Sequence, residues 1–197
     1  MEIAKSLGDF INPEWQSVDI PYDAFLTSGR PLDPASERGR QLFFGKAGCA
    51  NCHNGPLLSD QKFYALGLPA FGPGRARRWD PTARDVGRMG ESDDLRDAYR
   101  FKTPRLRNVA LTAPYGHNGA YPTLEGILRH HLDPQGMRAA WTRDMAALPS
   151  VPWVEDIAFV IQSDRYEMAR TAAKIDIKPR PLTEAKTPNM VRYWPLS

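Results

Sequence analysis

The chain has 197 residues, carries a formal net charge of +3, and is 42% hydrophobic and 25% charged. This length predicts one domain with enough apolar residues to bury a core. The small net charge argues against nucleic-acid binding, and the lack of any run of about 18 apolar residues argues against a transmembrane helix. The 15 glycines and 18 prolines predict a loop-rich protein with short helices.

The N-terminal segment predicts a short amphipathic helix, because its apolar residues recur at helical spacing and stop before Pro13. These residues are Ile3, Ala4, Leu7, Phe10 and Ile11. No basic start followed by an apolar run and a small-residue cleavage site is visible, so we expect no secretory signal. We expect this helix to be the tail of a longer element.

The middle of the chain predicts one helix followed by loops. The helix begins after a turn, with Asp33 or Ser36 as its N-cap, and ends toward Gly45. Residues 71–97 are rich in Gly, Arg and Asp and predict a long surface loop. Residues 101–121 predict irregular structure, because two prolines interrupt them.

The last third predicts three helices and a tail. The helices are expected at Thr123–Leu132, 137–145 and 154–173. Residues 178–197 hold four prolines and predict an extended or poorly ordered tail. No succession of alternating strands predicts a major sheet, so the expected fold class is mainly α with long irregular loops.

Cys49, Cys52 and His53 form a Cys-x-x-Cys-His motif, the attachment signature of haem c. Two thiols about one helical turn apart can each add to a vinyl group on neighbouring edges of the porphyrin. The next residue then lies beneath the iron, where its imidazole binds as an axial ligand. The motif therefore predicts one covalently attached haem c with His53 on its iron.

Other uses of this motif fit the sequence less well. A zinc site needs four ligands, but the chain has only two cysteines and the next histidine is His117. A redox-active cysteine pair is typical of a βαβ context, and none is predicted here. The remaining alternative is that the motif occurs by chance, which would require both cysteines of the chain to fall at this spacing next to a histidine.

The second axial ligand is expected on the predicted helix after Pro122, where His131 shares one apolar face with Leu124, Ile127 and Leu128. His130 points roughly 110° away from that face. His131 is the favoured ligand, while Met137, His130 and a five-coordinate iron stay open, as does a core role for His131. Ligation by two histidines would give a low-spin iron of lower potential than His/Met ligation.

Longer segments around these residues carry a family resemblance. They read GRQLFF at 39–44, CANCHNGP at 49–56, FKTPRLRNVALTAPY at 101–115, GHNG at 116–119 and TLE at 123–125. Together they resemble the C-terminal haem domain of bacterial di-haem cytochrome c peroxidases, a group that includes MauG, which matures an amine dehydrogenase cofactor. The resemblance covers roughly residues 3–173.

The resemblance implies a cytochrome c-like haem domain at 31–175, preceded by a linker helix and connection at 1–30 and followed by an irregular tail at 176–197. In the family the position of His131 holds the distal ligand, usually Met in the peroxidases and Tyr in MauG. Further site residues are implied by position alone. They are Arg107 for the haem propionates (with a solvated arginine as the alternative), His117 near the haem, and the backbone carbonyls of Thr112 and Pro114 for calcium.

The function implied is electron relay. The haem would take electrons from a small cytochrome c or cupredoxin and pass them to a peroxide-reducing haem in a second haem domain, in the periplasm. The single motif keeps two alternatives open, a stand-alone monohaem carrier and a truncated fragment that holds no haem. Peroxide reduction at this haem alone would need a vacant distal position and an acid/base group, for which His117 is a weak candidate. We therefore expect part of a cytochrome c peroxidase without activity of its own.

Overall fold

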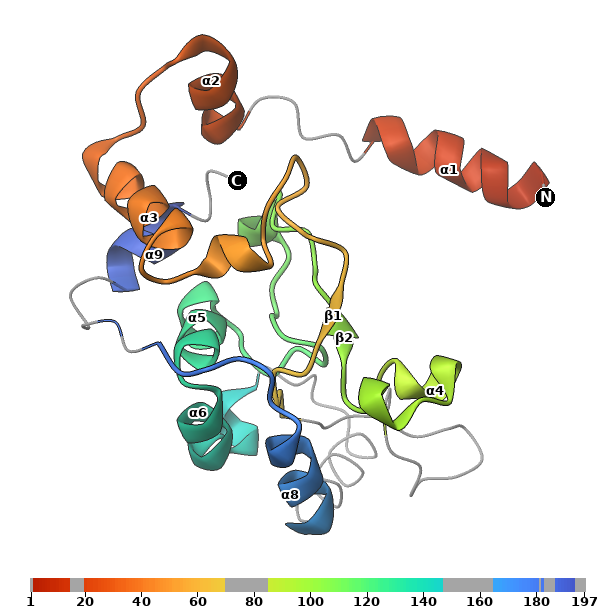
Figure 1. Ribbon diagram of the computed structural model, residues 1–197. Coiled ribbons are helices and arrows are strands. Elements are labelled where there is room, and N and C mark those ends of the chain that lie inside the picture. Colours follow the sequence, from red (N-terminus) through yellow and green to blue (C-terminus); the bar gives the residue numbers. More distant parts are fainter. Residues whose placement is uncertain are drawn as a thin grey trace.

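The computed structural model describes residues 2–14, 20–69, 85–146, 165–180, 182 and 187–193. Short helices joined by long irregular segments make up this part of the chain (Figure 1). The helices are α1 (Glu2–Glu14), α2 (Pro21–Ser28), α3 (Pro34–Phe44), α4 (Met89–Ser92), α5 (Leu124–Leu132), α6 (Pro134–Ala140), α8 (Arg165–Ala173) and α9 (Thr187–Tyr193).

Single turns of 3-10 helix and one small sheet complete the described elements. The turns lie at Cys49–Asn51, Leu95–Asp97, Val109–Leu111 and Arg143–Met145. Strands β1 (Phe63–Tyr64) and β2 (Phe101–Lys102) pair antiparallel, with Phe63 opposite Lys102 and Tyr64 opposite Phe101. The absence of a major sheet among the described residues agrees with the prediction of a mainly α protein.

Helix α3 begins as its sequence predicts. The Asp33 carboxylate accepts hydrogen bonds from the backbone N–H groups of Ala35 and Ser36, and Pro34 occupies the first turn, where its missing N–H costs nothing. Asp33 is therefore the N-cap, and Ser36 lies inside the helix. Phe43 near the end of α3 is completely buried.

Helix α5 is also confirmed at both ends. The Thr123 hydroxyl accepts from the N–H of Gly126, and the helix ends at Leu132. Asp133 then caps α6 by accepting from Gly136. This second cap corrects the helix expected at 137–145, because an Asp-Pro start places α6 at Pro134–Ala140 and leaves only a 3-10 turn beyond it.

The expected irregular tail is wrong for Thr187–Tyr193, which forms α9 and packs against α3 (Figure 1). Met190 on α9 is completely buried in the core cluster that also holds Phe43 of α3 and Leu128 of α5. Long-range burial therefore stabilises a helix that is too short to show a periodic pattern.

Three other expectations are partly tested. Helix α1 continues through Pro13 to Glu14, a difference within the usual uncertainty of helix ends. Residues 85–97 of the expected surface loop instead form α4 and a 3-10 turn, while 71–84 lie outside the described residues. The last expected helix is confirmed at Arg165–Ala173, and 154–164 lie outside the described residues.

Helix α1 lies apart from the rest of the described chain in Figure 1. Its apolar side chains are exposed to solvent, with Ile3 81% and Phe10 64% accessible. Of the helices that the structure describes, none combines the length and apolar character needed to cross a bilayer.

Candidate functional site

The Cys-x-x-Cys-His motif lies on a tight turn that follows α3. Gly48 enters it with a left-handed backbone (φ 64°), and Cys49 begins a 3-10 turn. The backbone N–H groups of Cys52 and His53 both donate to the Cys49 carbonyl, at 3.2 and 2.9 Å. The turn brings both thiols and the histidine to one end of α3.

The two cysteines have free thiols. Burial raises the pKa of the Cys49 thiol to about 12 and also raises that of Cys52. Both side chains are therefore protonated at neutral pH, whereas a redox-active pair has a lowered thiol pKa. This favours thiols held for covalent attachment over a disulfide-exchange pair.

His53 is buried, and its Nδ1 donates to the Leu58 carbonyl at 3.1 Å. Because a carbonyl can only accept, Nδ1 carries the proton and Nε2 keeps its lone pair. Burial, reinforced by the nearby charge of His131 when protonated, lowers the pKa of His53 to about 4. The imidazole is therefore neutral at pH 7, as a metal ligand must be.

His131 faces His53 from α5. The centroids of the two rings lie 6.3 Å apart, with their planes inclined by 59°. The Nδ1 of His131 donates to the Ile127 carbonyl one turn earlier, at 2.9 Å, and burial lowers the pKa of this imidazole. Both rings therefore carry the proton on Nδ1 and leave Nε2 unprotonated.

The spacing of the two imidazoles fits a metal ion between them. A histidine nitrogen lies about 2 Å from the metal it binds, so the centroids of two rings on opposite sides of one iron lie roughly 6 Å apart. Each ring also donates its other N–H to a backbone carbonyl, which is the usual arrangement behind a metal-bound histidine. The described residues thus fit a haem, which Cys49 and Cys52 would hold covalently and whose iron His53 and His131 would bind.

The sequence pattern places His130 away from the apolar face of α5, but this residue is completely buried. Its Nε2 donates to the Leu66 carbonyl at 2.7 Å, and its Nδ1 accepts from the Tyr121 hydroxyl at 2.9 Å. Both ring nitrogens of His130 therefore form hydrogen bonds. His130 has the structural role in the core that the sequence left open for His131. Met137, the other candidate ligand, packs against the core cluster.

Arg107 makes hydrogen bonds to two other segments of the described chain. Its Nη1 and Nη2 donate to both carboxylate oxygens of Asp23 at 2.8 and 2.7 Å, and its Nε donates to the Pro56 carbonyl at 2.6 Å. The side chain is 22% exposed and is paired within the protein, rather than fully surrounded by solvent. Contact with haem propionates stays a prediction.

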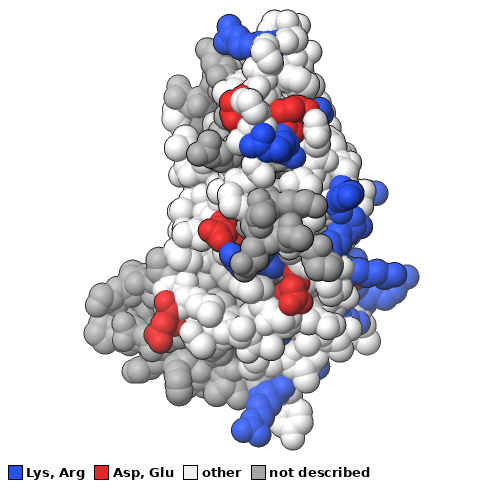
Figure 2. Space-filling model, turned by 90° about the vertical axis from the view of Figure 1, so that its left-hand side faces the viewer, with Lys and Arg blue, Asp and Glu red and all other residues white. Residues whose placement is uncertain are grey.

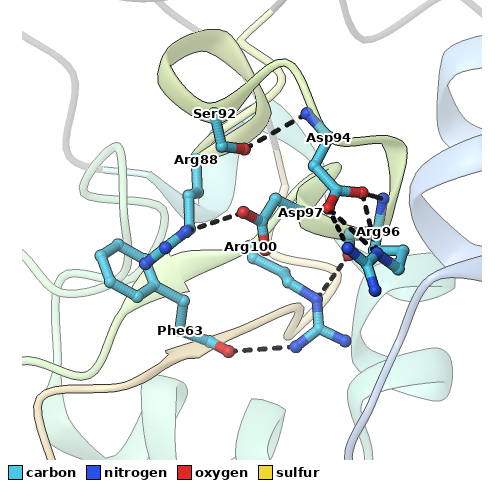
Figure 3. A network of polar contacts seen from close by, with 7 residues as sticks. All are labelled: Phe63, Arg88, Ser92, Asp94, Arg96, Asp97 and Arg100. Carbon is cyan, nitrogen blue, oxygen red and sulfur yellow. Dashed lines mark hydrogen bonds and ion pairs between the residues drawn. The ribbon is translucent and has the colours of Figure 1, made fainter.

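The structure joins His117 to Asp85 and Phe101. Its Nε2 lies 2.5 Å from an oxygen of Asp85, and its ring lies on Phe101 with centroids 3.7 Å apart. An ion pair and a hydrogen bond hold the segment that follows Asp85 (Figure 3), since Arg88 donates to the Asp97 carboxylate at 2.7 Å and Arg100 donates to the Phe63 carbonyl at 3.1 Å. His117 is thus part of a polar cluster built on β1 and β2.

Thr112 and Pro114, whose carbonyls were expected to bind calcium, are both exposed. The Thr112 hydroxyl donates to the Val109 carbonyl at 3.0 Å. Within the described ranges no three His, Cys, Asp or Glu side chains gather around a common point. Calcium binding through backbone oxygens therefore stays a prediction.

Arg180 is a site residue that the sequence reading missed, because it lies in the expected tail. Its backbone N–H donates to the Leu132 carbonyl at the end of α5, at 2.8 Å. Its guanidinium lies so close to Gly48 that a Cβ there would overlap it, and its positive charge opposes the rise in pKa of both thiols. No local pattern signals this contact, which joins segments 132 residues apart in their numbering.

Comparison with known proteins identifies the relatives of the chain. No family model matches the sequence. The chain is 38% identical over 129 residues to cytochrome-c peroxidase IdrP1 of Pseudomonas sp. strain SCT, covering 55% of this chain and 34% of that protein. It is 42% identical over 115 residues to cytochrome c peroxidase Ccp of Escherichia coli, covering 56% and 23%. It is 33% identical over 118 residues to the methylamine utilization protein MauG of Methylorubrum extorquens, covering 59% and 30%.

The homologues of this chain are cytochrome c peroxidases and MauG. The recognition from sequence motifs is therefore confirmed. The chain spans about a third or less of the length of these relatives.

Solved structures agree with this family. A MauG-like protein associated with microbial copper homeostasis matches with a TM-score of 0.57 and 27% identity, covering 91% of this chain and 51% of that one. The di-haem peroxidase BthA from Burkholderia thailandensis shows the same fold, with a TM-score of 0.60, 24% identity, and coverage of 89% and 45%. The predicted fold class, a mainly α cytochrome c-like haem domain with long irregular loops, is confirmed.

Proposed function

We propose that this chain is the haem c electron-transfer domain of a di-haem cytochrome c peroxidase-like oxidoreductase, relaying electrons to a peroxide-reducing haem elsewhere. The observation that carries the proposal is the opposed pair of imidazoles, His53 and His131, with ring centroids 6.3 Å apart. His53 directly follows Cys52 in the attachment motif, and its ring lies near that of His131, which supports one covalent haem with two histidine ligands.

A bound haem c would supply one-electron exchange between ferric and ferrous iron. The protein's part is to hold that group in a fixed environment. The carbonyls of Leu58 and Ile127 orient the two imidazoles and keep their Nε2 atoms unprotonated. If His53 and His131 both bound the iron, peroxide would find no open position there, which favours a relay over peroxide reduction at this site.

We also propose a division of the chain into a linker and a haem domain. Residues 31–175 would form the haem domain, and 1–30 the linker toward a second haem domain. The exposed apolar side chains of α1, with Leu7 56% accessible, support a contact with another part of the enzyme. We extend the haem domain to include Thr187–Tyr193, because α9 packs on α3.

The electron donor would be a small redox protein, a cytochrome c or cupredoxin, in the periplasm where haem c is attached. Lys and Arg side chains gather along one edge of the face in Figure 2, while Asp and Glu are more scattered. Such an edge would steer an acidic partner by long-range attraction. Calcium held through Thr112 and Pro114 would belong to the joint between the two haem domains.

The test uses the full chain produced with periplasmic haem c maturation. The dithionite-reduced protein is freed of reductant and mixed in a stopped-flow instrument with oxidised cytochrome c or with hydrogen peroxide. A relay domain should reduce the cytochrome c rapidly and react with peroxide only slowly. Sustained peroxide turnover by this chain alone would contradict the relay, and a product without covalent haem would contradict the haem assignment itself.

A further inference from the structure

Two adjacent histidines on α5 are used in different ways. The ring of His131 faces His53, whereas the ring of His130 is completely buried and forms a bridge. This bridge runs from the Tyr121 hydroxyl through the imidazole to the Leu66 carbonyl, with hydrogen bonds of 2.9 and 2.7 Å. It joins α5 to the segment that follows the haem-attachment motif and β1.

The Leu66 end of the bridge is fixed by its neighbours. The backbone of Ala65 exchanges two hydrogen bonds with Asp176, one to its carboxylate at 2.8 Å and one from its backbone N–H at 2.9 Å. On the other side, the guanidinium of Arg138 donates to the Gly67 carbonyl at 3.0 Å. The Leu66 carbonyl is therefore held in a defined position and can serve as an anchor.

The Tyr121 end is fixed as well. Its backbone forms two hydrogen bonds with Tyr115, at 2.7 and 3.0 Å, and its side chain is 2% exposed. Its hydroxyl is presented to His130 from outside α5. Because each helical residue is offset by about 100° from the next, a fixed direction for His130 also fixes the direction of His131.

We propose that His130 is a positioning residue, whose bridge between Tyr121 and Leu66 sets the rotation of α5 and so holds His131 opposite His53. This inference rests on the proposed axial ligation by His131. Without the imidazole, a buried hydroxyl and a buried carbonyl lose their partner, and the structure must shift or admit water to satisfy them. A shift of α5 would move His131 away from its position opposite His53.

The test compares four variants of the full holoprotein. His130→Phe fills the space without a hydrogen bond, and Tyr121→Phe removes only the hydroxyl. His130→Gln keeps an N–H donor near the position of Nε2. Met190→Ala on α9 is the control, because it also removes a completely buried side chain but carries no hydrogen bond to the attachment segment. Circular dichroism sets a temperature at which all variants are folded.

The readout is the rate at which carbon monoxide binds the reduced haem, since it must wait for His131 to leave the iron. We expect this rate to rise roughly tenfold in His130→Phe and several-fold in Tyr121→Phe. His130→Gln should lie closer to wild type. Met190→Ala should lower stability but leave the rate unchanged, which separates positioning from a general loss of stability.

Two outcomes would overturn the inference while leaving the proposed function intact. One is a wild-type rate in both His130→Phe and Tyr121→Phe, with a six-coordinate spectrum throughout. The other is an equal rise in Met190→Ala. If His130→Phe does not fold, Tyr121→Phe decides alone. Immediate carbon monoxide binding by the wild type would instead contradict ligation by His131 and the inference built on it.

Discussion

The guanidinium of Arg107 holds both carboxylate oxygens of Asp23, at 2.7 and 2.8 Å, in a two-point ion pair between α2 and the segment after β2. A further hydrogen bond, from Nε to the Pro56 carbonyl, reaches the chain just beyond the Cys-x-x-Cys-His motif. One side chain thereby connects α2, which lies in the proposed linker, to the loop that follows the attachment site.

Arg107→Lys should destabilise the protein, because an ammonium cannot reproduce the planar two-point contact or the bond to Pro56. We expect a loss of about 1–3 kcal/mol in the free energy of unfolding measured with urea. Arg129→Lys is the matched control, since its pair with Glu125 is exposed and should change stability by less than about 0.5 kcal/mol. Equal effects at both positions would disprove the structural role of Arg107.

Asp23 makes stability depend on pH. The hydrogen bond from Arg107 lowers the pKa of this carboxyl below its ordinary value of 3.8. Its contribution is therefore present above pH 3.8 and is lost as the pH falls through the lower folded-state pKa. Asp23→Asn should flatten this part of the curve when urea unfolding is measured between pH 6 and about pH 2. An unchanged acid slope would show that other carboxyls dominate it.

The thiols of the haem-free protein should be poorly reactive. Because burial raises the pKa of Cys49 to about 12, almost no thiolate exists at pH 7. We expect iodoacetamide to alkylate the folded apoprotein far more slowly than the unfolded chain in urea, with a rate that is still rising at pH 10. Rapid alkylation at pH 7, or a disulfide formed readily in air, would instead indicate a redox-active pair.

Met190→Ala tests whether α9 belongs to the folded domain. Truncating a completely buried methionine should cost about 2–5 kcal/mol, seen as a lower urea midpoint with a similar slope. A change within error would mean that the C-terminal segment contributes little to the core.

The sequence predicts those features that depend on local chemistry. Asp33, one of the two expected N-caps, begins α3, and the helix expected from Thr123 begins there with Thr123 as its N-cap, because a cap needs only the next three residues. The attachment motif could also be recognised from the sequence, since its chemistry lies within five consecutive residues. His131 could be singled out because it shares a helix face with apolar residues.

Features that depend on distant contacts could not be predicted. Helix α9 exists because Met190 is buried against the rest of the core. His130 is held in the core by the Leu66 carbonyl, which lies 64 positions away in the chain. The sequence pattern indicates only one buried face of α5, so it misses the second face, on which His130 lies. The same holds for Arg107, whose partner Asp23 is 84 positions away.

The most direct test of ligation by two histidines is the visible spectrum of the reduced holoprotein with and without carbon monoxide, in wild type and in His131→Ala. The 6.3 Å spacing of the His53 and His131 rings leads us to expect a sharp low-spin wild-type spectrum that carbon monoxide does not alter at once. His131→Ala should bind carbon monoxide immediately. A high-spin wild type that binds carbon monoxide as fast as His131→Ala would contradict the proposed ligand pair and the relay function that rests on it.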